Sequence, residues 1–452
     1  MNTSTTSVAL QRRLGVGTAT SVVVANMIGT GIFTTTGLML ARVESGWLVL
    51  GCWLVGGLIA LAGALSYAEL AAMMPRAGGE YVYLREVYGP RAAFLTGWTS
   101  FFVGFSAPIA ASAVACATYL IAAGLLPKNW LAEKGAALAA VAALTAVHCL
   151  SLRRGAAMQN ALTILKLVLL GGLLAAGFAF GAGGGDLFSG SSGEAKPGQL
   201  GVALLFVIFA YSGWNGASYI AEEVEEPGRT LPRALLAGTL AVMVIYLLLN
   251  VLLFYAAPVA ELRGVIPVGE VAAEKLFGPY GAQWLSGLVA LALLSSLSAY
   301  IMIGPRVYFA MARDGLFFRA AARVDPERET PAAAIVAQSV CAAVMVLTGT
   351  FEQLLTYIGF ALGIFPWMTV LGVVLLRRRA PQRERPYRVW LYPLLPLFFL
   401  AAMAAILAVA FVNSPWTSLV AVATVLAGIP AYELTVGRRE TAKPRMNTDE
   451  HR

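Results

Sequence analysis

Long apolar stretches separated by short charged segments dominate this sequence, and they predict a bundle of membrane-spanning helices. A helix needs about 20 predominantly apolar residues to cross the ~30 Å hydrocarbon core of a bilayer. Twelve stretches qualify, and we therefore predict an all-α multi-span membrane protein with 12 transmembrane helices. The predicted spans run approximately over residues 15–37, 47–73, 92–122, 134–151, 157–181, 200–221, 233–257, 281–311, 332–349, 353–376, 390–412 and 416–436.

The distribution of Lys and Arg tests this count, because cytoplasmic loops of membrane proteins are enriched in positive charge. With the N-terminus in the cytoplasm, 24 of the 32 Lys and Arg residues fall in inside segments and 6 in outside loops. The other two, Lys166 and Arg306, lie within predicted spans. A miscounted span would have inverted every loop after it. We therefore expect a multi-pass protein of the cell (inner, cytoplasmic) membrane with both termini in the cytoplasm.

Composition narrows the class further. Hydrophobic residues make up 59% of the chain and charged residues 12%, about half of the ~25% typical of soluble domains. The formal charge of +8 raises the question of nucleic-acid binding, but the basic residues form short clusters between apolar runs without interleaved stacking aromatics, so we expect no nucleic-acid partner. Four scattered Cys and two His give no metal framework, and the HExxH and GxSxG motifs are absent. We expect no metal, no cofactor and no enzymatic activity.

Two of the predicted spans are interrupted at their centres. The first contains Gly29-Thr30-Gly31, and the sixth contains Tyr211-Ser212-Gly213-Trp214-Asn215. Unwound backbone is tolerated in a membrane only where it lines a cavity or is buried in protein. Interruptions at matching places in two halves indicate an inverted-repeat transporter whose site lies at the breaks.

The spacing of these breaks predicts the internal organisation. Five spans in each unit is an odd number, so the second unit must be inverted relative to the first. The expected parts are a cytoplasmic tail at 1–14, a first repeat at 15–181 (helices 1–5), a second, inverted repeat at 200–376 (helices 6–10), helices 11–12 at 390–436 and a cytoplasmic tail at 437–452.

Six motifs follow one another along the chain in a characteristic order. They are Asn26-Met27-Ile28-Gly29-Thr30-Gly31-Ile32-Phe33, Gly78-Gly79-Glu80-Tyr81-Val82-Tyr83, Phe209-Ala210-Tyr211-Ser212-Gly213-Trp214-Asn215, Glu222-Glu223-Val224 with Glu226-Pro227-Gly228-Arg229-Thr230-Leu231-Pro232, Arg313-Asp314-Gly315, and Arg377-Arg378-Arg379 with Glu384-Arg385-Pro386. In this order the motifs resemble the amino acid–polyamine–organocation (APC) superfamily, and in particular its L-type amino acid transporter branch. The resemblance covers about residues 15–390 and implies a LeuT-like five-plus-five inverted repeat with helices 1 and 6 broken at mid-membrane, plus two extra C-terminal helices.

The broken helices offer partners for both charges of an α-amino acid. Free N–H groups at the start of the outer half of helix 1, at Gly29, Thr30 and Gly31, suit the carboxylate. Unpaired carbonyls at Met27, Phe209 and Ser212 suit the ammonium. The resemblance implies side-chain contacts from Phe209, Ser212, Trp214 and Asn215, with Phe209 as an aromatic gate; packing against neighbouring helices is the alternative role for Trp214 and Tyr211. Ser212 replaces the family's glycine, which narrows the pocket and disfavours large aromatic substrates.

Lys166 is the most informative single residue. It lies about nine residues into the fifth span, about 14 Å deep at ~1.5 Å per residue, where a lysine costs about 2.5–3.5 kcal/mol. In APC relatives without sodium coupling, a helix 5 lysine occupies the place of the second sodium ion. The resemblance implies that Lys166 bridges helix 1 carbonyls and a helix 8 hydroxyl among Ser295, Ser296 and Ser298. A purely structural or snorkelling lysine is the alternative, and proton coupling is conceivable.

These observations predict a sodium-independent secondary transporter of L-amino acids that works by alternating access, through exchange or proton-coupled uptake. An amine or polyamine permease or antiporter of the same superfamily is the alternative, although cationic substrates usually need an acidic partner and the breaks contain none. The partners expected are the small-molecule substrate and the lipid bilayer. The loop at about 123–133 has no cysteine, so no disulfide-linked partner subunit is expected.

Overall fold

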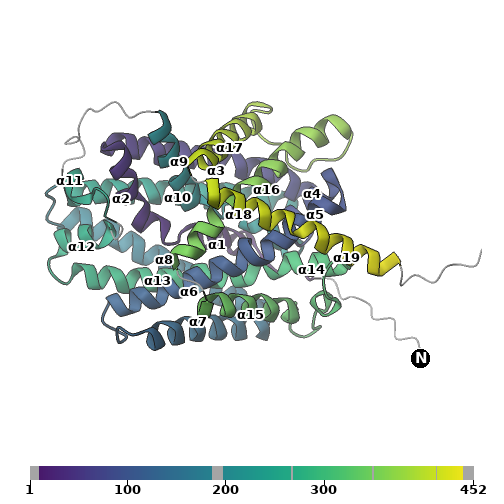
Figure 1. The fold of residues 1–452 in the computed structure, drawn as a ribbon, viewed down its shortest axis with the longest axis horizontal. Helices are drawn as coiled ribbons and strands as arrows, with labels where there is room; N and C mark the ends of the chain where they lie inside the picture. The colour runs from purple at the N-terminus through teal and green to yellow at the C-terminus, as the bar shows by residue number, and fades with distance from the viewer. Residues whose placement is uncertain (1–9, 186–196, 266–267, 349–350, 414, 441–452) are drawn as a thin grey trace, which may run out of the picture.

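The computed structural model describes residues 10–185, 197–265, 268–348, 351–413 and 415–440, and within these ranges the chain is helical without a β-strand (Figure 1). A single parallel bridge joins Leu14 to Val224. Most of the predicted tails, at 1–9 and 441–452, lies outside the described residues.

The predicted first repeat consists of eight α-helices and one π-helical turn, η1, in the middle of the third predicted span. The first span is divided into two helices, and short helices follow the second span. The elements are α1 (Val16–Met27), α2 (Gly31–Val43), α3 (Gly46–Met73), α4 (Glu80–Tyr88), α5 (Pro90–Thr99), η1 (Ser100–Ser106), α6 (Ala107–Ala122), α7 (Trp130–Leu150) and α8 (Leu152–Phe180).

The rest of the chain follows the remaining predicted spans, again with internal divisions. The sixth span is divided between α9 and a 3₁₀ helix, η2, and the eighth bends where Gly304 precedes Pro305. The elements are α9 (Pro197–Tyr211), η2 (Gly216–Glu223), α10 (Pro227–Ala256), α11 (Val259–Leu262), α12 (Val268–Phe277), α13 (Gly281–Ile303), α14 (Pro305–Arg313), η3 (Arg319–Ala322), α15 (Ala332–Thr348), α16 (Phe351–Arg379), α17 (Leu394–Asn413), α18 (Pro415–Leu426) and α19 (Gly428–Glu440).

Ten helical segments of the described chain are long and apolar enough to cross a membrane, so this is a multi-pass helical protein. Two of the twelve predicted spans are not among the ten. Helix α15 has 17 residues and is counted as a shorter apolar helix. Helix α16 has 29 residues and ends in Arg377-Arg378-Arg379. The count of twelve spans therefore stays a prediction.

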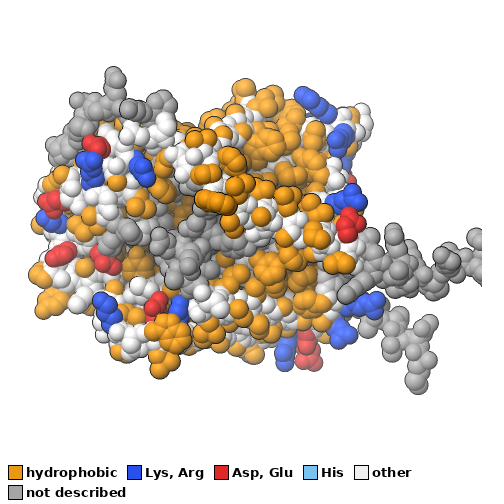
Figure 2. All heavy atoms as spheres, viewed as in Figure 1, with side chains coloured by type: hydrophobic (Ala, Val, Ile, Leu, Met, Phe, Trp, Pro, Cys, Tyr) orange, Lys and Arg blue, Asp and Glu red, His pale blue; other side chains and the backbone are white. Residues whose placement is uncertain are grey.

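Charged side chains lie mainly toward the two ends of the bundle, whereas hydrophobic side chains cover most of the middle of the visible face (Figure 2). Residues four apart on single helices are exposed, as in Ile164 and Val168 of α8 and Val340 and Val344 of α15. Because i and i+4 share a helix face, these pairs form apolar stripes suited to lipid. We call the end that carries α14 and α19 the termini side (Figure 1).

The interior is built around α1. This helix packs against α8, α10 and α13, while α10 also packs along α3 and α9 lies against α2. Most of the residues of α1 from Val22 to Met27 are fully buried. The broken helix therefore lies in the centre of the molecule, where its free backbone groups are shielded from lipid.

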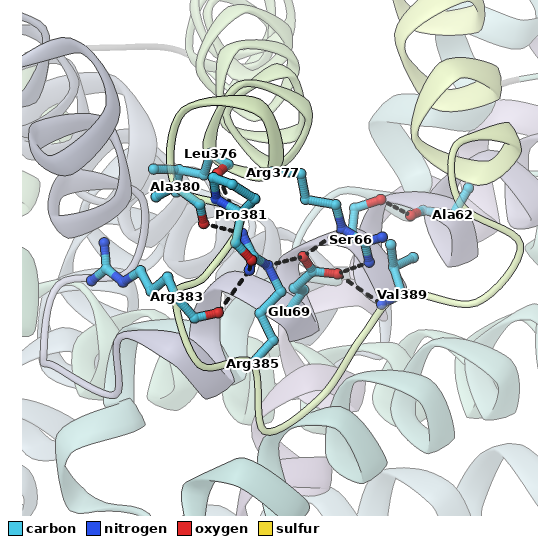
Figure 3. A network of polar contacts seen from close by, with 10 residues as sticks. All are labelled: Ala62, Ser66, Glu69, Leu376, Arg377, Ala380, Pro381, Arg383, Arg385 and Val389. Atoms are coloured by element: carbon cyan, nitrogen blue, oxygen red, sulfur yellow. Dashed lines mark hydrogen bonds and ion pairs between the residues drawn. The ribbon is translucent and has the colours of Figure 1, made fainter.

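A charged network fixes the loop between α16 and α17 to the end of α3 (Figure 3). Glu69 accepts two hydrogen bonds from Arg377, at 2.9 and 2.6 Å, and one from the Val389 N–H at 2.8 Å. Arg385 lies 3.3 Å from the same carboxylate and also donates to backbone carbonyls of the loop. Glu69 is thus an anchor for this loop and does not face the cavity described below.

Candidate functional site

The first break separates α1 from α2 over Ile28, Gly29 and Thr30. Ile28 leaves the helix with an extended backbone (φ −77°, ψ 97°), and α2 begins at Gly31. The first N–H groups of α2 have no carbonyl partner within their own helix, so they carry partial positive charge. A Cβ added at Gly29 would meet no atom within 4 Å, which shows that this stretch of backbone borders open space.

The second break lies directly against the first. Helix α9 ends at Tyr211 and η2 begins at Gly216, with Gly213 in the left-handed region at φ +98°. A Cβ at Gly213 would lie 2.7 Å from the backbone oxygen of Asn26, so only glycine allows this approach. The Asn26 amide also donates to the Gly213 carbonyl at 3.2 Å. The two interruptions therefore form one contiguous region of irregular backbone.

A cavity of about 160 Å³ lies at these breaks. One water needs about 10–15 Å³ by this measure, so the cavity has room for a small solute. The π-helical turn η1 contributes Ser100, Val103, Gly104 and Phe105 to its wall, in keeping with the tendency of π-bulges to occur at functional sites. All eight substrate-binding residues predicted from the sequence line it, namely Met27, Gly29, Thr30, Gly31, Phe209, Ser212, Trp214 and Asn215.

The backbone carbonyls at the breaks are partly engaged within the protein. The Tyr246 hydroxyl of α10 donates to the carbonyl of Met27 at 2.7 Å and to that of Ala210 at 3.0 Å. The Phe209 carbonyl accepts from the Ser212 N–H at 3.1 Å. A carbonyl oxygen has two lone pairs, so each can accept a second donor. Tyr246 thus joins the two breaks. This role could not be predicted from the sequence, because nothing in α10 distinguishes this tyrosine from its apolar neighbours.

Lys166 is fully buried in α8 and donates three hydrogen bonds. Its Nζ lies 3.2 Å from the Ala25 carbonyl, 2.8 Å from the Ile28 carbonyl and 2.9 Å from the Ser296 hydroxyl of α13. Ser296 in turn donates to the Ile28 carbonyl at 2.7 Å. The ammonium thus joins the end of α1 to α8 and α13. These contacts do not test its role in coupling, which stays a prediction.

Only one of the three candidate serines reaches Lys166. The Ser295 hydroxyl lies 3.3 Å from that of Thr163, and Ser298 lies 2.9 Å from Nε2 of His148. Of the three alternatives, Ser296 is therefore the hydroxyl that contacts the ammonium, whereas Ser295 and Ser298 face other groups. The reason is helix geometry, because successive residues at 3.6 per turn point in directions about 100° apart.

The aromatic residues of the second break have mixed roles. Trp214 lines the cavity, and its ring also lies edge-on to Tyr67 at 4.8 Å and to Phe399 at 5.8 Å between centroids. Tyr211 packs against Trp53 and Tyr246, at 5.8 and 5.1 Å. Trp214 is therefore held in place by packing while one part of it borders the cavity, whereas the Tyr211 ring is more fully enclosed.

Among the described residues that line this cavity, Glu80, at the start of α4, is the one with a charged side chain. Its Oε1 accepts from the Tyr67 hydroxyl at 2.7 Å and from the Asn215 amide at 2.7 Å. Burial raises the pKa of Glu80 to about 7, although these hydrogen bonds oppose the shift. In the sequence, Glu80 stands out only as part of the Gly78-Gly79-Glu80-Tyr81-Val82-Tyr83 motif. An acidic residue directly after a glycine pair, just beyond the end of a predicted span, was the signal available.

Two ion pairs join α14 and its end to η2 on the termini side, and one of them is buried. Arg306 of α14 makes a bidentate pair with Glu223 of η2, with N···O distances of 2.9–3.1 Å, and both side chains are almost fully buried. The N–H groups of Arg13 and Leu14 donate to the Glu223 carbonyl at 2.8 and 2.9 Å. Arg313 pairs with Glu222 at 2.7 Å. These contacts fasten the segment before α1 to η2 and α14.

The fold and this cavity define a class of protein: a multi-pass helical membrane protein with a central small-solute cavity between two interrupted helices. The family model described as amino acid permease matches residues 14–430. The chain therefore belongs to the amino acid permease family, which agrees with the motif resemblance.

Curated relatives are similar over nearly the whole chain. The mouse b(0,+)-type amino acid transporter 1 is 30% identical over 445 residues, covering 96% of this chain and 90% of that protein. The human Asc-type amino acid transporter 1 is 30% identical over 452 residues, covering 96% and 84%. The human large neutral amino acids transporter small subunit 2 is 31% identical over 440 residues, covering 95% and 81%.

Proposed function

We propose that this chain is a sodium-independent secondary transporter of amino acids that works by alternating access. The observation that carries the proposal is the cavity formed where two broken helices face each other, with helix-terminal backbone groups in its wall. Membership of the amino acid permease family and the printed activities of the relatives support the substrate class.

The cavity offers complementary groups for a zwitterion. The substrate carboxylate is bound by the N–H groups at Gly29, Thr30 and Gly31, where the start of α2 supplies partial positive charge. The ammonium is bound by the remaining lone pairs of the carbonyls at Met27, Phe209 and Ser212. The substrate side chain extends toward Phe209, Trp214 and the η1 turn. The open space beside Gly29 supports this orientation, because a ligand can approach the backbone there.

Sodium independence follows from Lys166. Its ammonium lies between α1, α8 and α13 and donates to the carbonyls of Ala25 and Ile28. A sodium ion would need those same oxygen atoms and would be repelled by the ammonium. Exchange and proton-coupled uptake both remain compatible with this arrangement.

The finer topology belongs to the same proposal. We propose twelve spans, a five-plus-five inverted repeat with the boundaries given above, two extra C-terminal helices, and a cell-membrane location with the termini side in the cytoplasm. Under this orientation the Arg306–Glu223 pair closes the cytoplasmic side, and it must separate when the cavity opens inward.

The test is uptake by the purified protein in liposomes. A panel of radiolabelled L-amino acids is offered outside vesicles that contain or lack unlabelled amino acid, with protein-free vesicles as the control. Saturable uptake of a neutral L-amino acid that is stimulated by internal amino acid indicates exchange, whereas uptake driven by an inward proton gradient indicates symport. No saturable uptake of any amino acid would refute the proposal.

One observation favours keeping the amine or polyamine alternative. The breaks themselves contain no acid, but Glu80 from α4 reaches the cavity wall next to Asn215. A carboxylate there is the kind of group that a cationic substrate needs. Adding a radiolabelled diamine to the same panel separates the two functions, since the alternative requires diamine uptake that exceeds amino acid uptake.

A further inference from the structure

Glu80 has three structural properties that are not explained by the binding of a zwitterionic substrate. It lines the central cavity, it is only 6% exposed, and it forms no ion pair within the part of the chain that the structure describes. An uncompensated carboxylate in such a place is costly unless it can accept a proton. The other buried acids, Glu69 and Glu223, are each paired with arginine.

The backbone around Glu80 explains how a loop residue reaches the cavity. Gly78 and Gly79 have φ values of +111° and +50°, and a Cβ at Gly79 would lie 2.7 Å from the Tyr219 ring. The Gly78 N–H donates to the Tyr219 carbonyl of η2 at 3.1 Å. The glycine pair thus lets this turn pack directly on η2 and delivers the carboxyl of Glu80 to the second helix break.

The polar groups that face Glu80 come from three elements. Tyr67 of α3 and Asn215 at the second break donate to Oε1, and the Tyr219 hydroxyl of η2 lies 3.3 Å from the same Asn215 amide. Tyr83 of α4 is a further buried tyrosine close to Glu80. The titratable groups around the carboxyl are therefore tyrosines, which stay neutral near neutral pH. Glu80 is the group that can change charge there.

We propose that Glu80 is a proton-binding site of the transport cycle and that its deprotonation slows transport. The proposal rests on the proposed transport function. Because Tyr67 and Asn215 both donate to Oε1, a proton from the cavity water can bind Oε2 while both hydrogen bonds remain. A proton needs no added volume, whereas an ammonium group would need space and several acceptors beside a residue that is only 6% exposed.

The direction of the effect follows from the strength of these bonds. A hydrogen bond to a carboxylate is roughly twice as strong as one to a neutral carboxyl group. The deprotonated form therefore holds Asn215, and with it the second break, more firmly to α3 and α4. Protonation loosens this attachment, so the broken helix moves more readily. The pKa of Glu80, raised to about 7 by burial, puts the change near neutral pH.

The experiment measures alanine exchange in liposomes with equal pH on both sides, from about pH 5.5 to about pH 8.5, a range that spans the raised pKa of Glu80. The wild-type rate should rise several-fold as the pH falls through about 7. In Glu80→Gln, which imitates the protonated form, the rate should stay near the low-pH level across the range. Glu433→Gln, at an exposed acid far from the cavity, serves as the control and should keep the wild-type profile.

Tyr67→Phe gives an independent test that does not require Glu80 to be replaced. Losing a donor to the charged form raises the pKa of the carboxyl, so the midpoint should move to higher pH by on the order of one unit. A wild-type exchange rate that does not depend on pH would overturn the proposal. So would a wild-type pH midpoint retained by both Tyr67→Phe and Glu80→Gln. A wild-type protein that exchanges no amino acid would instead overturn the proposed function.

Discussion

Replacing Lys166 by methionine removes the ammonium but keeps a side chain of similar length. Two of the three hydrogen bonds that are lost go to α1 carbonyls, at 3.2 and 2.8 Å. Hydrogen bonds to a charged group are worth about 1.5–3 kcal/mol each, so the attachment of α1 weakens by about 3 kcal/mol or more. At ~1.4 kcal/mol per factor of ten, the equilibrium between α1 positions shifts roughly a hundredfold.

We therefore expect Lys166→Met to lower the rate of amino acid exchange in liposomes by about two orders of magnitude. The fold should survive in detergent, because the substitution also removes a charge that is costly to bury, and the Ile28 carbonyl keeps its bond from Ser296. Leu165→Met, at the neighbouring residue of α8 that is 39% exposed, is the matched control and should behave as wild type.

The residual activity of Lys166→Met distinguishes two roles. If the lysine only supports α1, the pH midpoint of exchange should stay where Glu80 sets it while apparent substrate affinity changes. If Lys166 itself carries a proton, the pH dependence should disappear. A variant with the wild-type rate, affinity and pH profile would refute the reasoning and leave Lys166 as a structural residue.

Further predictions concern the ion, the helix break and the closed side. Replacing sodium by choline should leave uptake unchanged, and a collapse of uptake would contradict the role given to Lys166. Gly31→Val should abolish substrate binding measured by thermal shift, but it should also lower stability, because even its Cβ would lie 2.9 Å from the Cβ of Ala210. Gly29→Ala separates binding from stability better, because its Cβ meets no atom within 4 Å and the variant should fold normally. We expect it to weaken substrate binding. An unchanged affinity would mean that the substrate carboxylate binds elsewhere. Arg306→Met should lower the free energy of unfolding by about 3–5 kcal/mol, because it leaves the buried Glu223 carboxylate unpaired. The double variant with Glu223→Gln should recover most of this stability. If the two substitutions instead lower the stability additively, the pairing of these side chains is contradicted.

The class of protein could be predicted from the order of residues alone. Hydrophobic length and the asymmetric placement of Lys and Arg required a multi-pass helical membrane protein, because lipid leaves no alternative for so many apolar stretches. The two breaks were visible in the sequence as well, since glycine and polar residues in the middle of an apolar run cannot continue a lipid-facing helix. All eight substrate-binding candidates drawn from these breaks line the cavity.

Contacts between side chains on different helices could be learned only from the three-dimensional packing. Lys166 contacts Ser296 because of the way α13 is rotated about its own axis. Apolar residues occur all around this helix, so its sequence does not predict that rotation or which of Ser295, Ser296 and Ser298 makes the contact. The same is true of Tyr246, which joins two breaks from a third helix. Glu80 reaches the cavity only because a glycine turn packs against η2, a contact between residues about 140 positions apart. Such long-range contacts arise from packing, and no local pattern of residues encodes them.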